Sequence, residues 1–387
     1  MKKSILAIVI AVMMVVACAV SISAGRCDGA FAAANFSTLK EYTEADLGTK
    51  TMRAFCVDPN GKYYFGGNLH GGPTMYKFDA NSGDMLASYQ FAVDEGSYIK
   101  ALGADDRGYV YNGIANAAND GAFFFSILNM DTMEEQSYVE VKIDGKIGVN
   151  GIGVANVGGT YYCYVMTNYD TDRLYRFDVT NVKAPKMDTT FGEGGYIDMA
   201  AKYSFDDCNG VSADSNGYIY VTGLKQGGEG KADTFMKLNA DGSLAEEIAL
   251  ANGWNVEVLD DEYVVVSTRG GADSKVYVID SDVMEPVAEF TPSADAQGFS
   301  GAGIMNNKIY VCDHGEPDRV LVSDVLAITE KAAAPAETTA EEVVDAVAAD
   351  TTADTAVETA PKTFDAAIIA AVAAIVSAAG YAVSKKH

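Results

Sequence analysis

Hydrophobic and polar positions along this chain follow one pattern that recurs six times. Each copy reads as an apolar strand, a turn rich in Asp, Asn and Gly, a Tyr- and Val-rich strand, a Gly-rich loop and two further strands. The turns begin at residues 58, 105, 156, 214, 260 and 306, so successive copies lie 47, 51, 58, 46 and 46 residues apart. A four-stranded unit that repeats every ~40 to 50 residues predicts an all-β fold, a six-bladed β-propeller.

The last blade of this predicted propeller lacks one strand. The pattern places the blades at residues 51–93, 97–143, 148–198, 206–250, 253–291 and 298–325. The segment 35–42 near the N-terminus resembles the outermost strand of the fourth blade, and we expect it to complete the sixth blade. Closing the ring in this way removes exposed sheet edges, which otherwise invite aggregation. The propeller is therefore predicted to span residues 35–328.

The fourth copy of the repeat carries a family resemblance. Residues 209–222, Asn-Gly-Val-Ser-Ala-Asp-Ser-Asn-Gly-Tyr-Ile-Tyr-Val-Thr, resemble the NHL repeat and the related repeat of gluconolactonase-like propellers, and residues 54–64 and 102–111 follow the same pattern. The resemblance implies a propeller. Gluconolactonase-like members hold a divalent cation at the channel mouth, and Asn150 and Asn209 would be the matching ligands here. Such propellers include enzymes, scaffolds and binding proteins, so the resemblance does not choose among functions.

Both ends of the chain have the composition of membrane-targeting segments. Residues 1–24 combine a Lys pair with an apolar stretch, which predicts a signal peptide cleaved between about residues 24 and 34. Residues 329–363 are rich in Ala, Thr and Glu and predict a disordered stalk. Residues 364–384 predict a transmembrane anchor, followed by a cytoplasmic tail, 385–387. The expected location is the extracellular face of the cell membrane.

The net charge of the chain excludes some classes of binding partner. The formal net charge is −26 and the isoelectric point is about 4.3. Neither nucleic acid nor an anionic lipid surface is attracted by such a field, so a nucleic-acid partner is not expected. An extracellular glycan, peptide or protein is the expected partner, and the C-terminal helix is the expected contact with the membrane.

One position on the inner strand of each predicted blade carries a polar residue in most copies, although an inner strand is otherwise apolar. We expect side chains five residues before each turn to converge on the channel mouth that also collects the long loops between the second and third strands. Cations there suit an anion, and amides suit hydroxyl or carbonyl groups; the open alternative is a water-filled polar ring. The turns at the opposite end are read as structural. The candidate ligand-binding residues are Arg53, Lys100, Asn150, Asn209, Trp254, Asn255 and Ser300.

Evidence for chemistry is weaker. His70, His314 and Asp313 fall on loops of neighbouring blades and are candidate catalytic residues, with exposed loop histidines as the alternative. No cofactor is predicted, and a divalent cation at Asn150 and Asn209 is opposed by Arg53, because calcium favours carboxylate and carbonyl oxygens.

Cys56, Cys163, Cys208 and Cys312 are read as buried thiols, the alternative being the disulfides 163–208 and 56–312.

These observations predict a surface-anchored binding module that acts through its loop face and channel mouth. A metal-dependent, lactonase-like propeller hydrolase and a structural envelope protein remain alternatives. The sequence leaves enzymatic activity undecided and favours a module without one.

Overall fold

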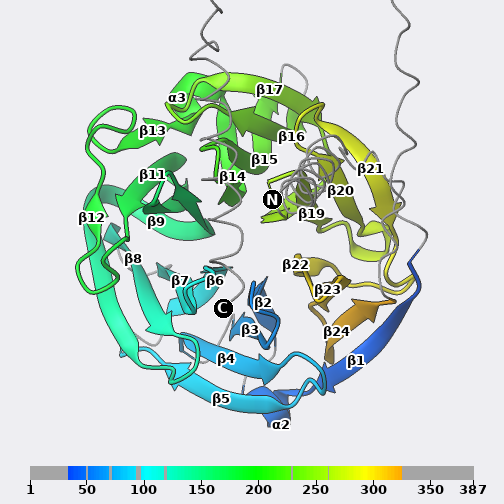
Figure 1. Cartoon of the computed structure of the whole chain (residues 1–387). Helices are drawn as coiled ribbons and strands as arrows, with labels where there is room; N and C mark the ends of the chain where they lie inside the picture. Colours follow the sequence, from blue (N-terminus) through cyan, green and yellow to red (C-terminus); the bar gives the residue numbers. More distant parts are fainter. Residues whose placement is uncertain are drawn as a thin grey trace, which may run out of the picture. The chain divides into compact units, whose positions relative to one another are not determined.

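The computed structural model describes residues 34–48, 51–68, 72–92, 97–116, 120–227, 230–259 and 261–324. These residues form the six-bladed β-propeller that the repeat predicts (Figure 1). The signal peptide, stalk and transmembrane anchor predicted for the two ends lie outside them. In the part of the chain that is described, no helix is long and apolar enough to cross a bilayer.

The first three blades occupy the N-terminal half of the ring. Blade one is an antiparallel sheet of four consecutive strands, while blades two and three share one strand. Their strands are β2 (Met52–Val57), β3 (Tyr63–Asn68), β4 (Thr74–Asp79), β5 (Met85–Gln90), β6 (Ser97–Ala104), β7 (Tyr109–Asn116), β8 (Asp120–Asn129), β9 (Glu135–Val157), β10 (Thr160–Tyr169), β11 (Arg173–Asp178), β12 (Lys186–Met187) and β13 (Tyr196–Asp198).

The other three blades complete the ring. Blades four and five are built from consecutive strands, and blade six has the order β22, β23, β24 and β1 from the axis outward. Their strands are β14 (Phe205–Ala213), β15 (Ile219–Gly227), β16 (Gly230–Leu238), β17 (Leu244–Ala249), β18 (Gly253–Leu259), β19 (Tyr263–Thr268), β20 (Val276–Asp280), β21 (Glu285–Phe290), β22 (Phe299–Met305), β23 (Lys308–Asp313), β24 (Asp318–Ser323) and β1 (Phe36–Tyr42). Short helices α2 (Glu44–Leu47), α3 (Met199–Tyr203) and η1 (Gly271–Asp273) lie between strands.

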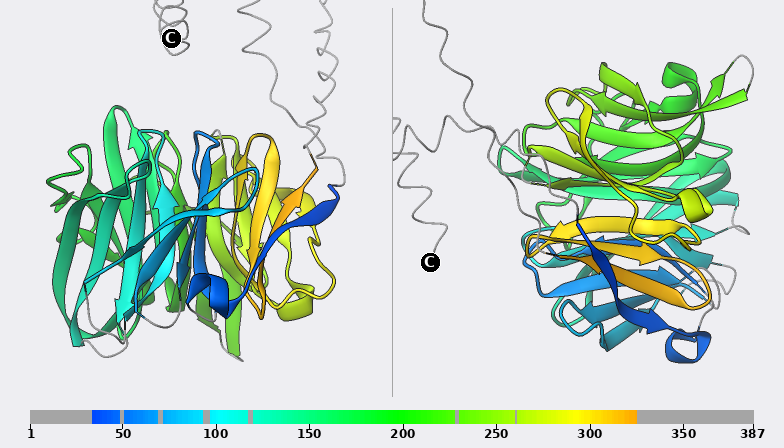
Figure 2. Two further views of the ribbon diagram at one scale, coloured as in Figure 1. Left: turned by 90° about the horizontal axis from the view of Figure 1, so that it is seen from below. Right: turned by 90° about the vertical axis from the view of Figure 1, so that its right-hand side faces the viewer.

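The N-terminal strand closes the ring as expected. β1 pairs antiparallel with β24, from Phe36 opposite Ser323 to Tyr42 opposite Asp318 (Figure 2). The inner strands contact one another in the cyclic order β2, β6, β9, β14, β18, β22 and back to β2. The predicted all-β propeller and its closure by both ends of the body are confirmed.

Blades two and three differ from the prediction because they are continuous. The single strand β9 pairs with β8 through residues 135–146 and with β10 through residues 147–157. It is therefore the outer strand of one blade and the inner strand of the next. The sequence predicted separate blades at 97–143 and 148–198; the chain instead crosses from one blade to the next without a loop.

The hydrophobic core lies between blades. Each of six clusters of buried side chains joins two neighbouring blades, as where Tyr42 and Phe78 meet Tyr310 between blades one and six. Burial of this apolar surface favours the closed ring over separate sheets.

Near the axis the inner strands approach so closely that side chains do not fit. A Cβ atom on Gly210 would lie 2.5 Å from the Trp254 carbonyl oxygen. The ring therefore requires glycine after Asn209.

Candidate binding mouth

Every inner strand has a β-bulge at the same height in the ring. The pairing register shifts at Arg53, Lys100, Asn150, the pair Asn209–Gly210, Trp254 and Ser300. A bulge bends the strand and re-aims its side chain, and bulges are frequent beside functional sites. We call this end of the channel the loop mouth and define it by these residues.

The structure corrects the sequence register by one residue in blades five and six. The side chain at the bulge is Trp254 and not Asn255 in β18, and Ser300 and not Gly301 in β22. In these two strands, as in β9, the bulge lies six residues before the turn, whereas in β2, β6 and β14 it lies five before, and a fixed spacing from the turn does not detect this difference. Trp254 thus takes the place in the ring that the spacing gave to Asn255.

The predicted residues do gather at this mouth. Lys100, Asn150, Trp254, Asn255 and Ser300 line one recess, and the guanidinium carbon of Arg53 lies 5.0 Å from the centroid of the Trp254 ring. Asn209 is buried between β14 and β18, where its Nδ2 donates to the Gly253 carbonyl oxygen at 3.1 Å. The recess has a volume of about 10 Å³, close to that of one water-sized probe. A ligand larger than water must therefore lie across the mouth, above the recess.

The amide and hydroxyl side chains link neighbouring blades. Asn150 Nδ2 donates to the Cys208 carbonyl oxygen at 2.7 Å, and Ser300 Oγ donates to the Met52 carbonyl oxygen at 2.7 Å. Asn255 Oδ1 accepts from the Ala302 amide at 3.4 Å. With the bond from Asn209, each of these side chains holds the inner strand of the next blade. Their polarity thus has a structural cause that the sequence did not reveal.

Arg53 and Lys100 break this pattern. Within the described residues, neither side chain has a hydrogen bond or a carboxylate within ion-pair distance, and Arg53 Nε is buried without a partner. The carboxylate whose charge acts on both cations is Asp207, which accepts from Asn168 Nδ2 at 3.1 Å. Lys100 is only 8% exposed, and burial lowers its pKa to about 8, opposed by Asp207 and reinforced by Arg53. Burial also lowers the pKa of Arg53.

A second arginine, which was not among the candidates from the sequence, lies at the same mouth. Arg269 follows β19, and its guanidinium carbon is 4.7 Å from the Trp254 ring centroid. Its Nη2 is 2.8 Å from His314 Nε2. Because arginine only donates, His314 Nε2 accepts, and Nδ1 carries the proton that it donates to the Gly298 carbonyl oxygen. Burial lowers the pKa of His314, which agrees with this neutral form. His314 therefore positions Arg269 beside Trp254.

Two tyrosines form the other side of the loop mouth. Lys100 Nζ lies 5.0 Å from the ring centroid of Tyr169, which is 47% exposed and has a φ of 78°. The hydroxyl groups of Tyr98 and Tyr169 are 2.6 Å apart. Positive φ is unfavourable for an aromatic residue, and such strain is concentrated at functional sites. The mouth therefore combines three cations with exposed aromatic surface.

Of the three candidate catalytic residues, the structure describes Asp313 and His314 but not His70. Asp313 Oδ1 accepts from the amides of Gln297 and Gly298, and its Oδ2 accepts from Arg319 at 2.6 Å. The hydrogen bonds of Asp313 therefore stabilise the loop that contains Gln297 and Gly298. His70 lies outside the described residues, so its pairing with His314 stays a prediction. No group of three or more His, Cys, Asp or Glu side chains among the described residues has the arrangement of a metal site.

The cysteines are buried free thiols, as the sequence favoured. Cys56, Cys163, Cys208 and Cys312 form no disulfide, so the alternative pairings 163–208 and 56–312 are not made. Burial raises the pKa of each thiol well above its ordinary value, which keeps them protonated and unreactive.

No family model matches the chain, and no curated protein matches it. Among solved structures, it is similar to the Dos1 propeller, with 11% identity and a TM-score of 0.43 over 70% of this chain and 78% of that one. It is also similar to the Cps50 (Swd1) β-propeller domain of Myceliophteria thermophila, with 9% identity and a TM-score of 0.43 over 75% of this chain and 99% of that one. The resemblance to NHL-repeat and gluconolactonase-like propellers stays a prediction.

Proposed function

We propose that this protein is a surface-displayed recognition module that binds an anionic ligand across the loop mouth. The observation that carries the proposal is the contrast within one ring of bulges. The amide and hydroxyl side chains there link blades, whereas Arg53 and Lys100 have no such bond and no ion pair with a described residue. Lys100 is buried and Arg53 is half-buried, and a charged side chain that loses water without gaining an opposite charge is costly, so both favour a ligand that supplies that charge.

The chemistry of the mouth indicates a carboxylate attached to a body with some apolar surface. Arg53 and Arg269 can each donate two parallel hydrogen bonds to a carboxylate. The exposed ring of Tyr169 suits the apolar side of a sugar ring or a peptide side chain. The net charge of −26 repels polyanions at long range, so affinity has to come from these direct contacts. An acidic glycan or an acidic peptide meets these conditions.

The extracellular location is part of the proposal and depends on the sequence of the two ends. Residues 1–24 support export, and residues 364–384 support an anchor. Labelling of intact cells with an antibody against the propeller tests this directly. Labelling without permeabilisation supports surface display, and labelling only after permeabilisation contradicts it.

One observation favours a second candidate, the metal-dependent hydrolase. Asn150 Oδ1 and Asn209 Oδ1 are buried without a hydrogen-bond partner in the described structure, and amide oxygens are ligands for calcium. Two amide oxygens beside Arg53 and Lys100 are a poor fit for a divalent cation, which favours several carboxylates. We therefore place this function second.

A thermal-shift survey of the full-length protein separates the two candidates. Glucuronate and succinate should raise the melting temperature, glucose should not, and Arg53→Met should abolish the shift, because a ligand that binds only the folded state stabilises it. Lys62→Met, at an exposed lysine, is the matched control. A shift with calcium that is lost in Asn209→Ala would favour the hydrolase instead.

A further inference from the structure

A second cavity lies at the opposite end of the channel from the loop mouth. It has a volume of about 340 Å³ and is bounded by the C-terminal ends of the inner strands and by the first turn of several blades. We call this end the turn mouth. The sequence assigned these turns a purely structural role. A volume above ~300 Å³ is in the range of small-molecule sites.

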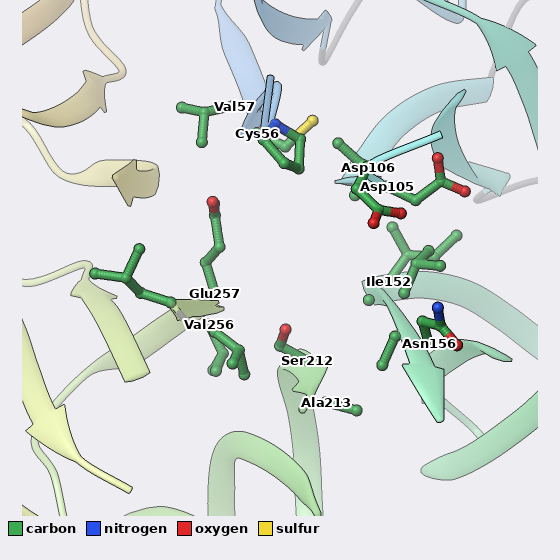
Figure 3. A pocket seen from close by; sticks show the side chains of 18 of the residues that line it. Cys56, Val57, Asp105, Asp106, Ile152, Asn156, Ser212, Ala213, Val256 and Glu257 are labelled. Carbon is green, nitrogen blue, oxygen red and sulfur yellow. The ribbon is translucent and has the colours of Figure 1, made fainter. Parts of the chain in front are cut away.

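One ionisable side chain reaches into this cavity from β18. Figure 3 shows Glu257 extending from its strand into the cavity, with its tip toward Val57. Its carboxyl group lies where a side chain on Gly303 would otherwise be, because a Cβ atom there would be 2.4 Å from Glu257 Oε2. Within the described residues, no hydrogen bond or ion pair satisfies this carboxyl group. The carboxyl group is half-buried and faces the cavity, so a ligand that enters the cavity can pair with it.

The wall of the cavity combines apolar and acidic side chains. Val57, Leu102 and Ile152 contribute hydrocarbon surface, and no lysine or arginine lines the described cavity. The titratable groups that line the cavity with Glu257 are Cys56 from β2, Asp105 and Asp106 after β6, Tyr161 from β10 and Asp261 after β18. β14 and β22 contribute no titratable group to it.

Among the described residues, no cation forms an ion pair with two of these carboxylates, Asp106 and Asp261. Asp106 accepts a hydrogen bond from Tyr161 at 2.8 Å, and Asp261 accepts one from the Ser215 amide at 2.8 Å. Asp105, in contrast, pairs with Arg107 at 2.7 Å. The turn mouth therefore has negative charge where the loop mouth has positive charge. Burial raises the pKa of Glu257 to about 8, so a bound cation would favour release of its proton.

We propose that the turn mouth binds a small aliphatic ammonium compound, whose ammonium group pairs with Glu257 and whose hydrocarbon part lies against Val57, Leu102 and Ile152. The ammonium group supplies both the charge and the hydrogen-bond donors that the carboxylate lacks. The hydrocarbon part buries apolar surface inside the channel. This site is separate from the anion site proposed above and does not depend on it.

Isothermal titration of the full-length protein with n-hexylammonium tests the proposal, with n-hexanol and hexanoate as probes of the same chain length. We expect n-hexylammonium to bind at least tenfold more tightly than either. Between about pH 6.5 and about pH 8.5 its affinity should rise about 20-fold as Glu257 ionises. Repeating the titration in buffers of different ionisation enthalpy should show a proton released on binding.

Two variants complete the test. Glu257→Gln keeps the shape of the side chain and should reduce n-hexylammonium binding to the level of n-hexanol. Glu285→Gln, at an exposed position on β21 of the same blade, should leave binding unchanged. Equal affinity for the three probes, absence of binding at both pH values, or unchanged binding in Glu257→Gln would overturn the proposal. The comparison of n-hexylammonium with n-hexanol and hexanoate uses the natural protein, so it tests the proposal even if Glu257→Gln does not fold.

Discussion

The guanidinium carbon of Arg53 lies 5.0 Å from the centroid of the Trp254 ring, although the two residues belong to blades one and five. Both are bulged residues of inner strands, and the closed ring brings them together. A cation over the face of an indole is attracted by its quadrupole. This pair leaves the donor groups of Arg53 free to bind an anion, which is the basis of the proposed function.

The pH dependence of anion binding should follow Lys100. Burial lowers its pKa to about 8, so the ammonium group is charged below about pH 8 and neutral above it. We expect the affinity for glucuronate to fall severalfold between about pH 7 and about pH 9. Lys100→Arg should remove this dependence, because arginine stays protonated. Titrations at the two pH values check it; equal pH dependence in both proteins would contradict the role of Lys100.

Asn209 should contribute to stability more than to anion binding. Its Nδ2 donates to the Gly253 carbonyl oxygen of the next blade. Asn209→Ala leaves that oxygen without its partner and should lower the free energy of unfolding by about 1 kcal/mol. Urea unfolding measures this, and Asn216→Ala in the exposed turn after β14 is the control. A normal stability combined with lost anion binding would show instead that Asn209 contacts the ligand.

The contribution of the N-terminal strand can be measured at Tyr42. This buried residue packs against Phe78, with ring centroids 4.7 Å apart, and its hydroxyl group donates to the Gly83 carbonyl oxygen at 2.5 Å. Tyr42→Ala should lower the free energy of unfolding by about 3 kcal/mol, through lost burial and a cavity. Tyr42→Phe keeps the ring and should cost about 1 kcal/mol, for the hydrogen bonds. Equal stability of all three proteins would mean that β1 does not hold the ring closed.

Glu257 should make the protein less stable as pH rises. Its pKa is about 8 in the folded protein and about 4.5 ordinarily. Below both values the carboxyl group is protonated in both states. Between them the unfolded chain loses the proton that the folded chain retains, so the free energy of unfolding falls as pH rises toward about 8.

Comparison with Glu257→Gln isolates this effect from other ionisable groups. The stability of the variant relative to the natural protein should increase between about pH 5 and about pH 8. Urea unfolding at several pH values provides the measurement. A constant difference across that range would mean that Glu257 keeps an ordinary pKa.

The sequence predicted the architecture well because a propeller repeats its local rules. Turn residues such as Asp58 and Asp214 recur with the period of the blade, and apolar strands alternate with them. The closing strand was predictable from the similarity of residues 35–42 to another outer strand. The continuity of β9 was not predictable from the sequence. A strand that passes from one blade to the next and a loop that joins two strands have no turn residues that tell them apart.

The candidate site was predicted in outline. The polar register identified Arg53 and Lys100, but it did not show that Asn150 and Ser300 hold neighbouring blades. That distinction depends on which carbonyl group each side chain meets. Arg269 was not among the candidates, since its contact with Trp254 depends on how the loop after β19 folds. Glu257 was missed because an acidic residue in a strand normally faces solvent, and only the closed channel encloses it.

Trp254 is the only tryptophan in the chain, so its fluorescence reports on the loop mouth alone. Titrating the full-length protein with glucuronate while recording this fluorescence tests the proposed function most directly. We expect a saturable change with glucuronate, none with glucose, and at least a tenfold loss of affinity in Arg53→Met. The same response to both sugars, or no saturable response to glucuronate and succinate, would contradict the claim that this mouth binds an anion.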